Sequence, residues 1–330
     1  MQSRKSFKPK KKIKPFYFII FLIIIFVFLG ILWTSWKNQW DKAYRFTAVI
    51  NSDPLYVISV NPVYHELVIL KVPSDVYLNV PYGYGNYLAG NVFALGTLDS
   101  KRSGGYLLRK SIENTFAIVT EGYLAKKTGK PEIRLNNKDD IRKIKSKFFS
   151  FVGVITSFPE FIAYFSDLET NLSFMDKFNL WNAIRSTRLD NIIILDIDEA
   201  SVFSKEKLPD GTFIKIIDPE LFDAFISFKF QDQLVRSEKV SLEIINAAEK
   251  DRLASLFGRI LNNLGANVVA KDTSEESKDF ICLIRLSEKK KVKSHIVKRL
   301  KALYHCEIDS EISEKNIADV EVILGKQFLK

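Results

Sequence analysis

The sequence predicts an α+β protein with an N-terminal transmembrane helix, a mixed-sheet α/β domain and a small βαββαβ C-terminal domain. Residues 15–36 carry no charge, and residues 46–230 contain short Val- and Ile-rich runs followed by amphipathic segments. Residues 240–328 differ in character, with strand and helix patterns in the order βαββαβ. Such mixed patterns are typical of helices packed on sheets. The 294 residues after Trp36 are too many for one typical domain and fit two.

The N-terminal segment is predicted to be a signal-anchor. The cytoplasmic basic tail, 1–14, holds seven basic residues and no acid. The 22 residues of 15–36 reach roughly 33 Å as a helix, enough for a hydrocarbon core of about 30 Å. Trp33, Trp36 and Trp40 suit an interfacial aromatic belt, and the basic tail favours a cytoplasmic N-terminus. We therefore expect a single-pass cell-membrane protein whose bulk is extracytoplasmic.

The alternative is a cleaved signal peptide. Signal peptides have a shorter apolar region, of about 7–15 residues, followed by small residues at the cleavage site. Here the apolar run is longer and leads into the bulky sequence of 32–36. A retained anchor fits this pattern better.

The net charge of +10 does not indicate a nucleic-acid partner. Without the tail, 42 Lys and Arg stand against 39 Asp and Glu, a balance of +3. The expected partner of the tail is the lipid bilayer, whose inner leaflet is anionic. We therefore expect no nucleic-acid binding.

The domain at 46–230 begins with three predicted strands and continues with helices. The strands are rich in Val and Ile and bounded by turn residues, and Asn61-Pro62 starts a hairpin turn. A loop is expected at 81–86. Helices are expected from apolar residues at three- and four-residue spacing. The strands are 47–50, 55–60, 67–72 and 191–197, and the helices are 103–119, 136–158 (ended by Pro159), 172–184 and 219–228.

The last ninety residues are predicted to fold as a separate βαββαβ unit with both helices on one face of the sheet. Residues 231–239 are polar and are predicted to link the two domains. Gly265 stands where a glycine commonly follows a helix. The strands are 240–245, 268–270, 280–286 and 320–324, and the helices follow the apolar faces of 253–264 and 292–303.

This C-terminal unit resembles the LytR C-terminal domain of bacterial envelope proteins, over about residues 238–328. The resemblance is carried by 240–246, Arg252-Leu253-Ala254, 264–269 and, most specifically, 318–328. The family has Asn-Gly after its first strand, whereas here Asn246 is followed by alanine. The resemblance implies a βαββαβ-like fold and a binding or assembly role.

The domain at 46–230 resembles, more weakly, the LytR-CpsA-Psr transferase domain. The matching segments are Ser52-Asp53 with 55–62, the strand 67–75, and the helical region from Ala94 to Glu113. Members of this family transfer a glycopolymer from a polyprenyl-pyrophosphate carrier to peptidoglycan, using arginines, aspartates and usually magnesium. Where the family has Pro-Arg-Asp, this chain has Pro73-Ser74-Asp75, and Asn51 replaces the arginine before Ser-Asp.

Those departures concern the diphosphate. Planar guanidinium groups bind phosphate oxygens in pairs, which serine and asparagine cannot do. We therefore expect a degenerate, non-catalytic domain without a cofactor. In the alternative, a transferase of this family would place Asp53, Asp75, Arg185 and Arg188 at one magnesium-dependent site.

Three further groups of residues are weighed as sites. Asp196 and Asp198 share one face of a strand end and are weak metal candidates, because no third ligand can be assigned. Tyr82, Tyr84 and Tyr87 could stack on sugar rings, but a half-buried turn is the simpler interpretation. The basic residues of 289–301, Arg299 included, could meet an anionic polymer, although such faces are usually only solvated.

Cys282 and Cys306 are the only cysteines. An exterior location would permit a disulfide between them, and buried free thiols are the simpler interpretation. The sequence leaves this open. The predicted function is that of an anchored envelope protein which binds or organises wall glycopolymer or envelope partners.

Overall fold

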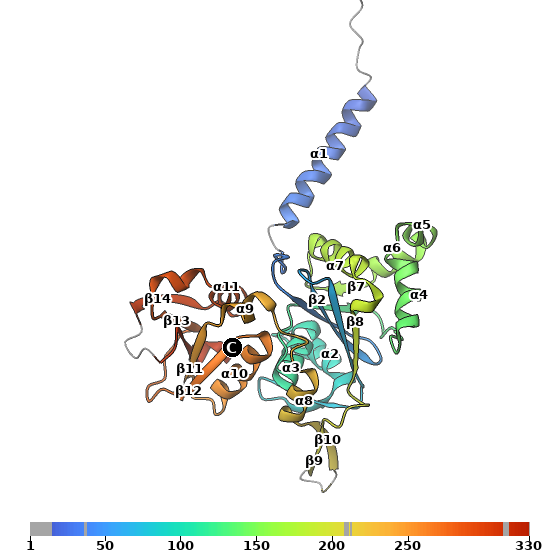
Figure 1. The fold of residues 1–330 in the computed structure, drawn as a ribbon. Coiled ribbons are helices and arrows are strands. Elements are labelled where there is room, and N and C mark those ends of the chain that lie inside the picture. The colour runs from blue at the N-terminus through green and yellow to red at the C-terminus, as the bar shows by residue number, and fades with distance from the viewer. Residues whose placement is uncertain (1–14, 36–37, 208–210, 212, 313–316, 330) are drawn as a thin grey trace, which may run out of the picture.

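The computed structural model describes residues 15–35, 38–207, 211, 213–312 and 317–329, with a mixed α+β architecture. Helix α1 (Pro15–Ser35) extends away from the body of the molecule (Figure 1). Among the residues whose side chains are described, no helix is both long and apolar enough to cross a membrane. The predicted tail and the end of the predicted span lie outside the described residues.

The first domain is built on a six-stranded mixed sheet in the order β7-β6-β1-β2-β3-β8. The strands β1, β2 and β3 are antiparallel neighbours, and the hairpin turn predicted at Asn61-Pro62 joins β2 to β3. Asn61 Oδ1 accepts hydrogen bonds from the backbone of that turn. Strands β6 and β8 add in parallel to β1 and β3. The strands are β1 (Phe46–Ile50), β2 (Leu55–Asn61), β3 (Glu66–Val72), β6 (Gly122–Lys126), β7 (Leu168–Thr170) and β8 (Ile192–Asp196).

Both faces of this sheet are covered by helices. Val49, Val57 and Leu70 pack in one core with the helices α2, α3 and α8, while Phe46 and Ile58 pack in another with α4 and α7. The two sets alternate along the strands because side chains of a strand point to opposite faces. The helices are α2 (Ala89–Leu98), α3 (Gly104–Phe116), α4 (Lys138–Phe148), α7 (Phe174–Ser186) and α8 (Pro219–Ile226).

A second sheet of four strands, in the order β5-β4-β10-β9, was not predicted. Its edge strand β9 carries mostly exposed charged residues, which conceal the alternation of a half-buried strand. The expected loop at 81–86 is a turn whose last two residues belong to β5. The strands are β4 (Tyr77–Val80), β5 (Gly85–Leu88), β9 (Phe203–Lys207) and β10 (Phe213–Ile217).

The single helix predicted to end at Pro159 is wrong. The chain forms α4, then α5 (Phe151–Thr156) and α6 (Phe158–Ser166). Ser150 Oγ accepts a hydrogen bond from Gly153 N and starts α5, and Pro159 lies in the first turn of α6, where its missing N–H costs nothing. Val152 and Ile155, expected in the buried stripe, are 73% and 75% exposed.

The C-terminal domain has a five-stranded sheet in the order β12-β11-β15-β13-β14. The predicted βαββαβ order is extended by one strand, β14, and both α10 and α11 pack in the core on one face of the sheet. Gly265, with φ of 108°, ends α10 as expected. The elements are β11 (Ser241–Ala247), α10 (Leu253–Leu264), β12 (Asn267–Thr273), β13 (Cys282–Leu286), α11 (His295–Tyr304), β14 (Glu307–Ile312) and β15 (Val320–Gly325).

The cysteines form a disulfide, so the interpretation as free thiols is wrong. Cys282 at the start of β13 and Cys306 after α11 have Cα atoms 4.4 Å apart, and both are buried. The sequence could not show this, because the cysteines are 24 positions apart and the chain between them folds back through α11. The bond joins the end of that helix to the sheet.

The residues predicted as a linker, 231–239, contain the short helix α9 (Gln233–Glu238). Asp232 is 2% exposed, and its carboxylate accepts hydrogen bonds from Leu234 N and from Arg45 N at the start of the first sheet. Val235 lies in the C-terminal core. The connection is therefore packed against both domains.

Candidate functional site

Four strands of the first sheet, β1, β3, β6 and β8, run in the same direction and end at one edge. Asp53 follows β1, Ser74 and Asp75 follow β3, and Asp196 ends β8. The topology therefore brings both predicted aspartates to this edge, which we call the carboxyl edge. Polar groups at the ends of parallel strands are a common setting for ligand sites in mixed sheets.

The Asp53 carboxylate is held by a neutral partner. Ser74 Oγ donates a hydrogen bond of 2.7 Å to Asp53 Oδ1. The backbone of Asp53 forms an isolated parallel β-bridge with that of Glu132. Lys130 reaches the same place, but its amine donates to the carbonyl oxygen of Gly90. Among the described residues, no ion pair within 4 Å joins Asp53 or Asp75 to a basic side chain.

The Asp196 carboxylate forms an ion pair with a lysine of the neighbouring strand. Lys71 Nζ lies 2.7 Å from Asp196 Oδ2, and this contact raises the pKa of the lysine. Asp196 Oδ1 accepts from the backbone of Asp198, whose own side chain is exposed. Within the described parts of the chain, no group of three or more His, Cys, Asp and Glu side chains could hold a metal ion.

The two candidate arginines lie at the opposite edge. Arg185 lies in the last turn of α7, and Arg188 precedes the amino end of β8. This strand pairs in register with β3 from Leu67↔Ile192 to Lys71↔Asp196. That length of strand separates the two edges by roughly 13 Å, at about 3.3 Å per residue. The structure therefore does not bring Asp53, Asp75, Arg185 and Arg188 together at one site.

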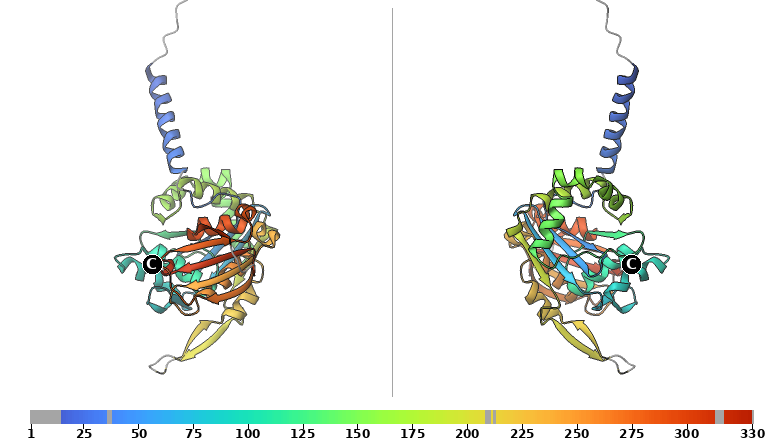
Figure 2. Two further views of the ribbon diagram at one scale, coloured as in Figure 1. Left: turned by 90° about the vertical axis from the view of Figure 1, so that its left-hand side faces the viewer. Right: turned by 90° about the vertical axis from the view of Figure 1, so that its right-hand side faces the viewer.

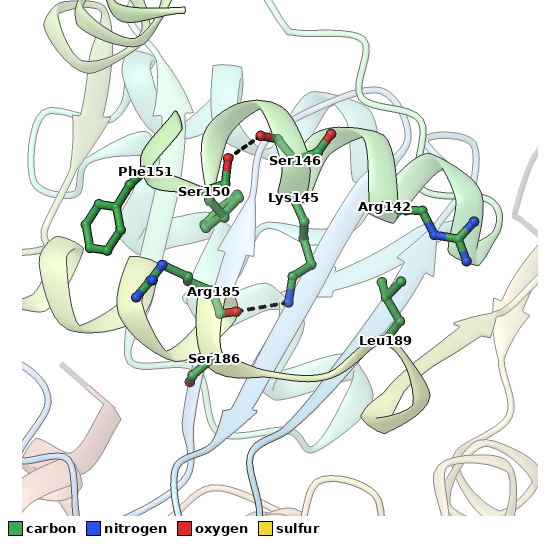
Figure 3. Close-up of a pocket in the computed structure, with 9 residues that line it drawn as sticks. Arg142, Lys145, Ser146, Ser150, Phe151, Arg185, Ser186 and Leu189 are labelled. Carbon is green, nitrogen blue, oxygen red and sulfur yellow. Dashed lines mark hydrogen bonds between the residues drawn. The ribbon is translucent and has the colours of Figure 1, made fainter. Parts of the chain in front are cut away.

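Arg185 instead lines an open cavity of about 480 Å³ between α4, α5 and α7 (Figure 3). Its guanidinium lies 4.1 Å from the centre of the Phe151 ring, an arrangement of the cation–π kind. Lys145 also lines the cavity, but its amine caps α7 by donating to the carbonyl oxygens of Ile184 and Thr187. Arg188 is exposed and lies 3.9 Å from Asp190.

The tyrosine turn is tied to the body of the first domain. The Tyr82 and Tyr106 hydroxyls are 2.8 Å apart, and Arg102 lies 3.9 Å from the centre of the Tyr82 ring. Burial and this hydroxyl contact raise the pKa of Tyr82. Tyr84 donates to Asp99. These contacts occupy the hydroxyl groups of Tyr82 and Tyr84.

The most deeply buried charged contacts join the two domains, and the sequence interpretation missed them. Arg299 of α11 lies 2.7 Å from Glu121, and the two side chains are only 6% and 5% exposed. Arg299 was expected on the basic outer face of its helix, and that is wrong. The Tyr304 hydroxyl on the same helix donates a hydrogen bond of 2.9 Å to Glu113 of α3. No spacing in the sequence signals contacts across 178 and 191 residues.

A second contact joins α8 to α10. Arg259 donates from Nε and one terminal nitrogen to both oxygens of Asp223, at 2.5 and 2.9 Å, and Asn263 adds a hydrogen bond of 3.0 Å. Such a bidentate pair fixes orientation as well as distance. Together with Ala117 and Val119, which pack in the C-terminal core, these contacts set the angle between the domains.

No family profile and no curated protein matches the chain. TagV of Bacillus subtilis is 13% identical with a TM-score of 0.39, over 55% of this chain and 94% of that chain.

Two other matched structures carry different functional descriptions. The LytR-CPS2A-psr family protein YwtF (TagT), with bound octaprenyl pyrophosphate lipid, is 16% identical with a TM-score of 0.35, over 56% and 89%. A transcriptional regulator from Enterococcus faecalis is 12% identical with a TM-score of 0.40, over 68% and 88%. At these identities and TM-scores, neither a ligand nor an activity is carried over to this chain.

Proposed function

We propose that this protein is a single-pass, membrane-anchored protein of the bacterial cell envelope that binds or organises wall glycopolymer, or an envelope partner, without catalysing transfer. The anchor is residues 15–36, with the basic tail in the cytoplasm against anionic lipid. The two domains then lie outside the membrane. The sequence resemblance to the LytR C-terminal domain and to LytR-CpsA-Psr supports this assignment.

One observation carries the non-catalytic part of the proposal. At the carboxyl edge, the position between Pro73 and Asp75 is a serine whose hydroxyl bonds Asp53, while Arg185 and Arg188 lie at the opposite edge. A leaving diphosphate carries several negative charges and needs guanidinium groups directed at it. The carboxyl edge is therefore acidic, and among the described residues the arrangement supports a site without guanidinium groups directed at such a diphosphate.

The polymer-binding surface that we propose is the basic face of the C-terminal domain. Its lysines are exposed on α11 and on the short 3-10 helix before it, Lys289–Lys293. Wall polymers of the teichoic type carry repeated phosphates, and a row of exposed lysines attracts such a chain. The exposed members are Lys289, Lys290, Lys293, Lys298 and Lys301.

The test uses the full chain in lipid nanodiscs with isolated cell-wall sacculi. We expect co-sedimentation with sacculi that carry anionic polymer and little with sacculi from which it has been removed. Lys298→Glu with Lys301→Glu should weaken co-sedimentation several-fold. Reversing two exposed lysines elsewhere, Lys229→Glu with Lys250→Glu, is the matched control and should have little effect.

The enzyme alternative is tested in the same preparation. A polyprenyl-pyrophosphate-linked glycan and Mg²⁺ are supplied, and glycan on the sacculi is measured. We expect none above the level without protein. Transfer that Asp75→Ala abolishes would overturn the proposal. Protease treatment of intact cells checks the topology, because an inaccessible C-terminal domain would contradict an extracytoplasmic location.

A further inference from the structure

We propose that the outer faces of α5, α6 and α7 lie on the surface of the bilayer, an inference that depends on the membrane anchor of the proposed function. We call these faces the apolar cap. Its partner is the anionic lipid of the leaflet from which the two domains emerge. The protein would then touch the membrane at two places, the anchor and the apolar cap.

The apolar cap exposes large side chains where a soluble surface would bury or replace them. On α5, Phe151, Val152 and Ile155 are 62%, 73% and 75% exposed, and on α6, Phe158 and Ile162 are 55% and 49% exposed. The spacing of three and four residues places each set on one side of its helix. Contiguous exposed apolar surface of this kind marks a contact with a partner or a membrane.

The third helix continues the same surface. Phe174 and Phe178 of α7 are one turn apart, and each is 51% exposed. Trp181 stacks on Phe178 at 6.2 Å between ring centres and lies 5.9 Å from Phe151. The rings therefore form a continuous strip from α7 to α5. Aromatic side chains favour the interface between water and lipid.

The apolar cap lies at the end of the body from which α1 leaves, as the two views of Figure 2 show. The polypeptide just after α1 is fastened to the start of α7. Asp176 accepts hydrogen bonds from Gln39 N at 3.0 Å and Trp40 N at 3.2 Å, and Ser173 Oγ lies 2.7 Å from Asn38 Oδ1. An anchor ending at residue 36 therefore holds α7 close to the lipid surface.

The charges beside the apolar cap suit anionic lipid. Arg142, Lys143 and Lys147 are exposed on α4, and Arg185 stacks on Phe151 at the rim of the cavity (Figure 3). Apolar side chains flanked by basic ones are typical of helices that lie in the interface plane. Lys147 also lies 2.5 Å from Glu160, which brings α4 and α6 together.

The test uses the full chain reconstituted into vesicles and single cysteines labelled with a fluorophore. Cys282 and Cys306 are paired and do not compete for the label. Val152→Cys and Ile155→Cys report on the apolar cap. Val269→Cys is the matched control, because Val269 is 50% exposed on the edge strand β12, far from α1 (Figure 1). Brominated lipids quench a fluorophore that touches the acyl region.

In vesicles with equal parts of phosphatidylglycerol and phosphatidylcholine, quenching at Val152→Cys and Ile155→Cys should exceed that at Val269→Cys several-fold. It should fall in phosphatidylcholine alone. Equal quenching at the three positions would overturn the inference. So would disulfide cross-linking of Val152→Cys between two copies, which would assign the apolar cap to a second chain. Failure of the protein to float with the vesicles would instead contradict the anchor itself.

Discussion

Replacing Arg299 with methionine would leave Glu121 buried without its cation. The two side chains are 2.7 Å apart and 6% and 5% exposed, so water cannot take the place of the guanidinium. Removing one partner of such a buried pair costs about 3–5 kcal/mol of unfolding free energy. Glu121 keeps the hydrogen bond from Thr47 N, at 2.8 Å, and the attraction of the Arg109 charge as partial compensation.

Removing both charges should be far milder. In Glu121→Gln with Arg299→Met neither charge of this pair remains, and the replacements are close in volume. Such neutral substitutions are often close to neutral in stability. The non-additivity of the two single variants then measures the coupling between the domains.

The assay is urea unfolding of the full chain in detergent micelles, followed by tryptophan fluorescence. The matched control is Lys290→Met, which removes the ion pair between Lys290 and Glu288. These two groups are 2.5 Å apart, and their side chains are 74% and 53% exposed. The substitution should leave the free energy of unfolding nearly unchanged, because water screens an exposed pair. If Arg299→Met cost no more unfolding free energy than Lys290→Met, the contact between Arg299 and Glu121 would not hold the domains together.

The same pair predicts a pH dependence. Burial raises the pKa of Glu121 above its ordinary value of 4.5. The folded state therefore binds its proton at a higher pH than the unfolded state. This group's stabilising contribution is complete below the unfolded pKa and is lost as the pH rises through the folded pKa. The difference in unfolding free energy between the native protein and Glu121→Gln should follow that course, and a flat difference would contradict it.

Three further outcomes are expected. Cys282→Ser with Cys306→Ser opens a loop with a sequence separation of 24 and should cost about 3 kcal/mol, seen as a lower melting temperature that reductant alone reproduces. Gly105→Ala places a methyl group 2.2 Å from the Tyr123 ring and should cost about 1–3 kcal/mol in urea unfolding. Hydrogen bonds, first of all that with Lys291, lower the pKa of Asp319 below its ordinary value of 3.8. The contribution of Asp319 to the free energy of unfolding is therefore present above pH 3.8 and is lost as the pH falls through the folded pKa. Asp319→Asn should reduce that acid sensitivity in a pH titration of unfolding.

The sequence predicted the elements whose apolar pattern reflects their own burial. The strands β1, β2 and β3 and the helices α7 and α10 follow from the spacing of residues such as Ile58 and Leu261, which are buried. The strands β9 and β14 did not follow, because most of their residues are polar and carry no clear apolar alternation. The break between α4 and α5 depends on Gly153, whose Cβ would lie 2.0 Å from the Ser146 carbonyl oxygen.

The candidate site was predictable only in part. Asp53 and Asp75 follow strands of one sheet, and the sequence placed them at strand ends. The opposite position of Arg185 depends on the direction of β8, which the sequence pattern does not give. Arg299 looked like one of several solvated cations, because burial by a distant segment leaves no periodicity behind.

The fastening of residues 39–40 to Asp176 has a mechanical consequence. The same carboxylate completes the capping box of α7 with Ser173, so one side chain bears both the exit of the chain from α1 and the start of that helix. A sideways pull or a rotation applied to residues 39–40 would therefore reach the first turn of α7 directly. From α7 it would pass through the sheet and the Glu121–Arg299 contact to the C-terminal domain, so load on one end of the molecule would be felt at the other.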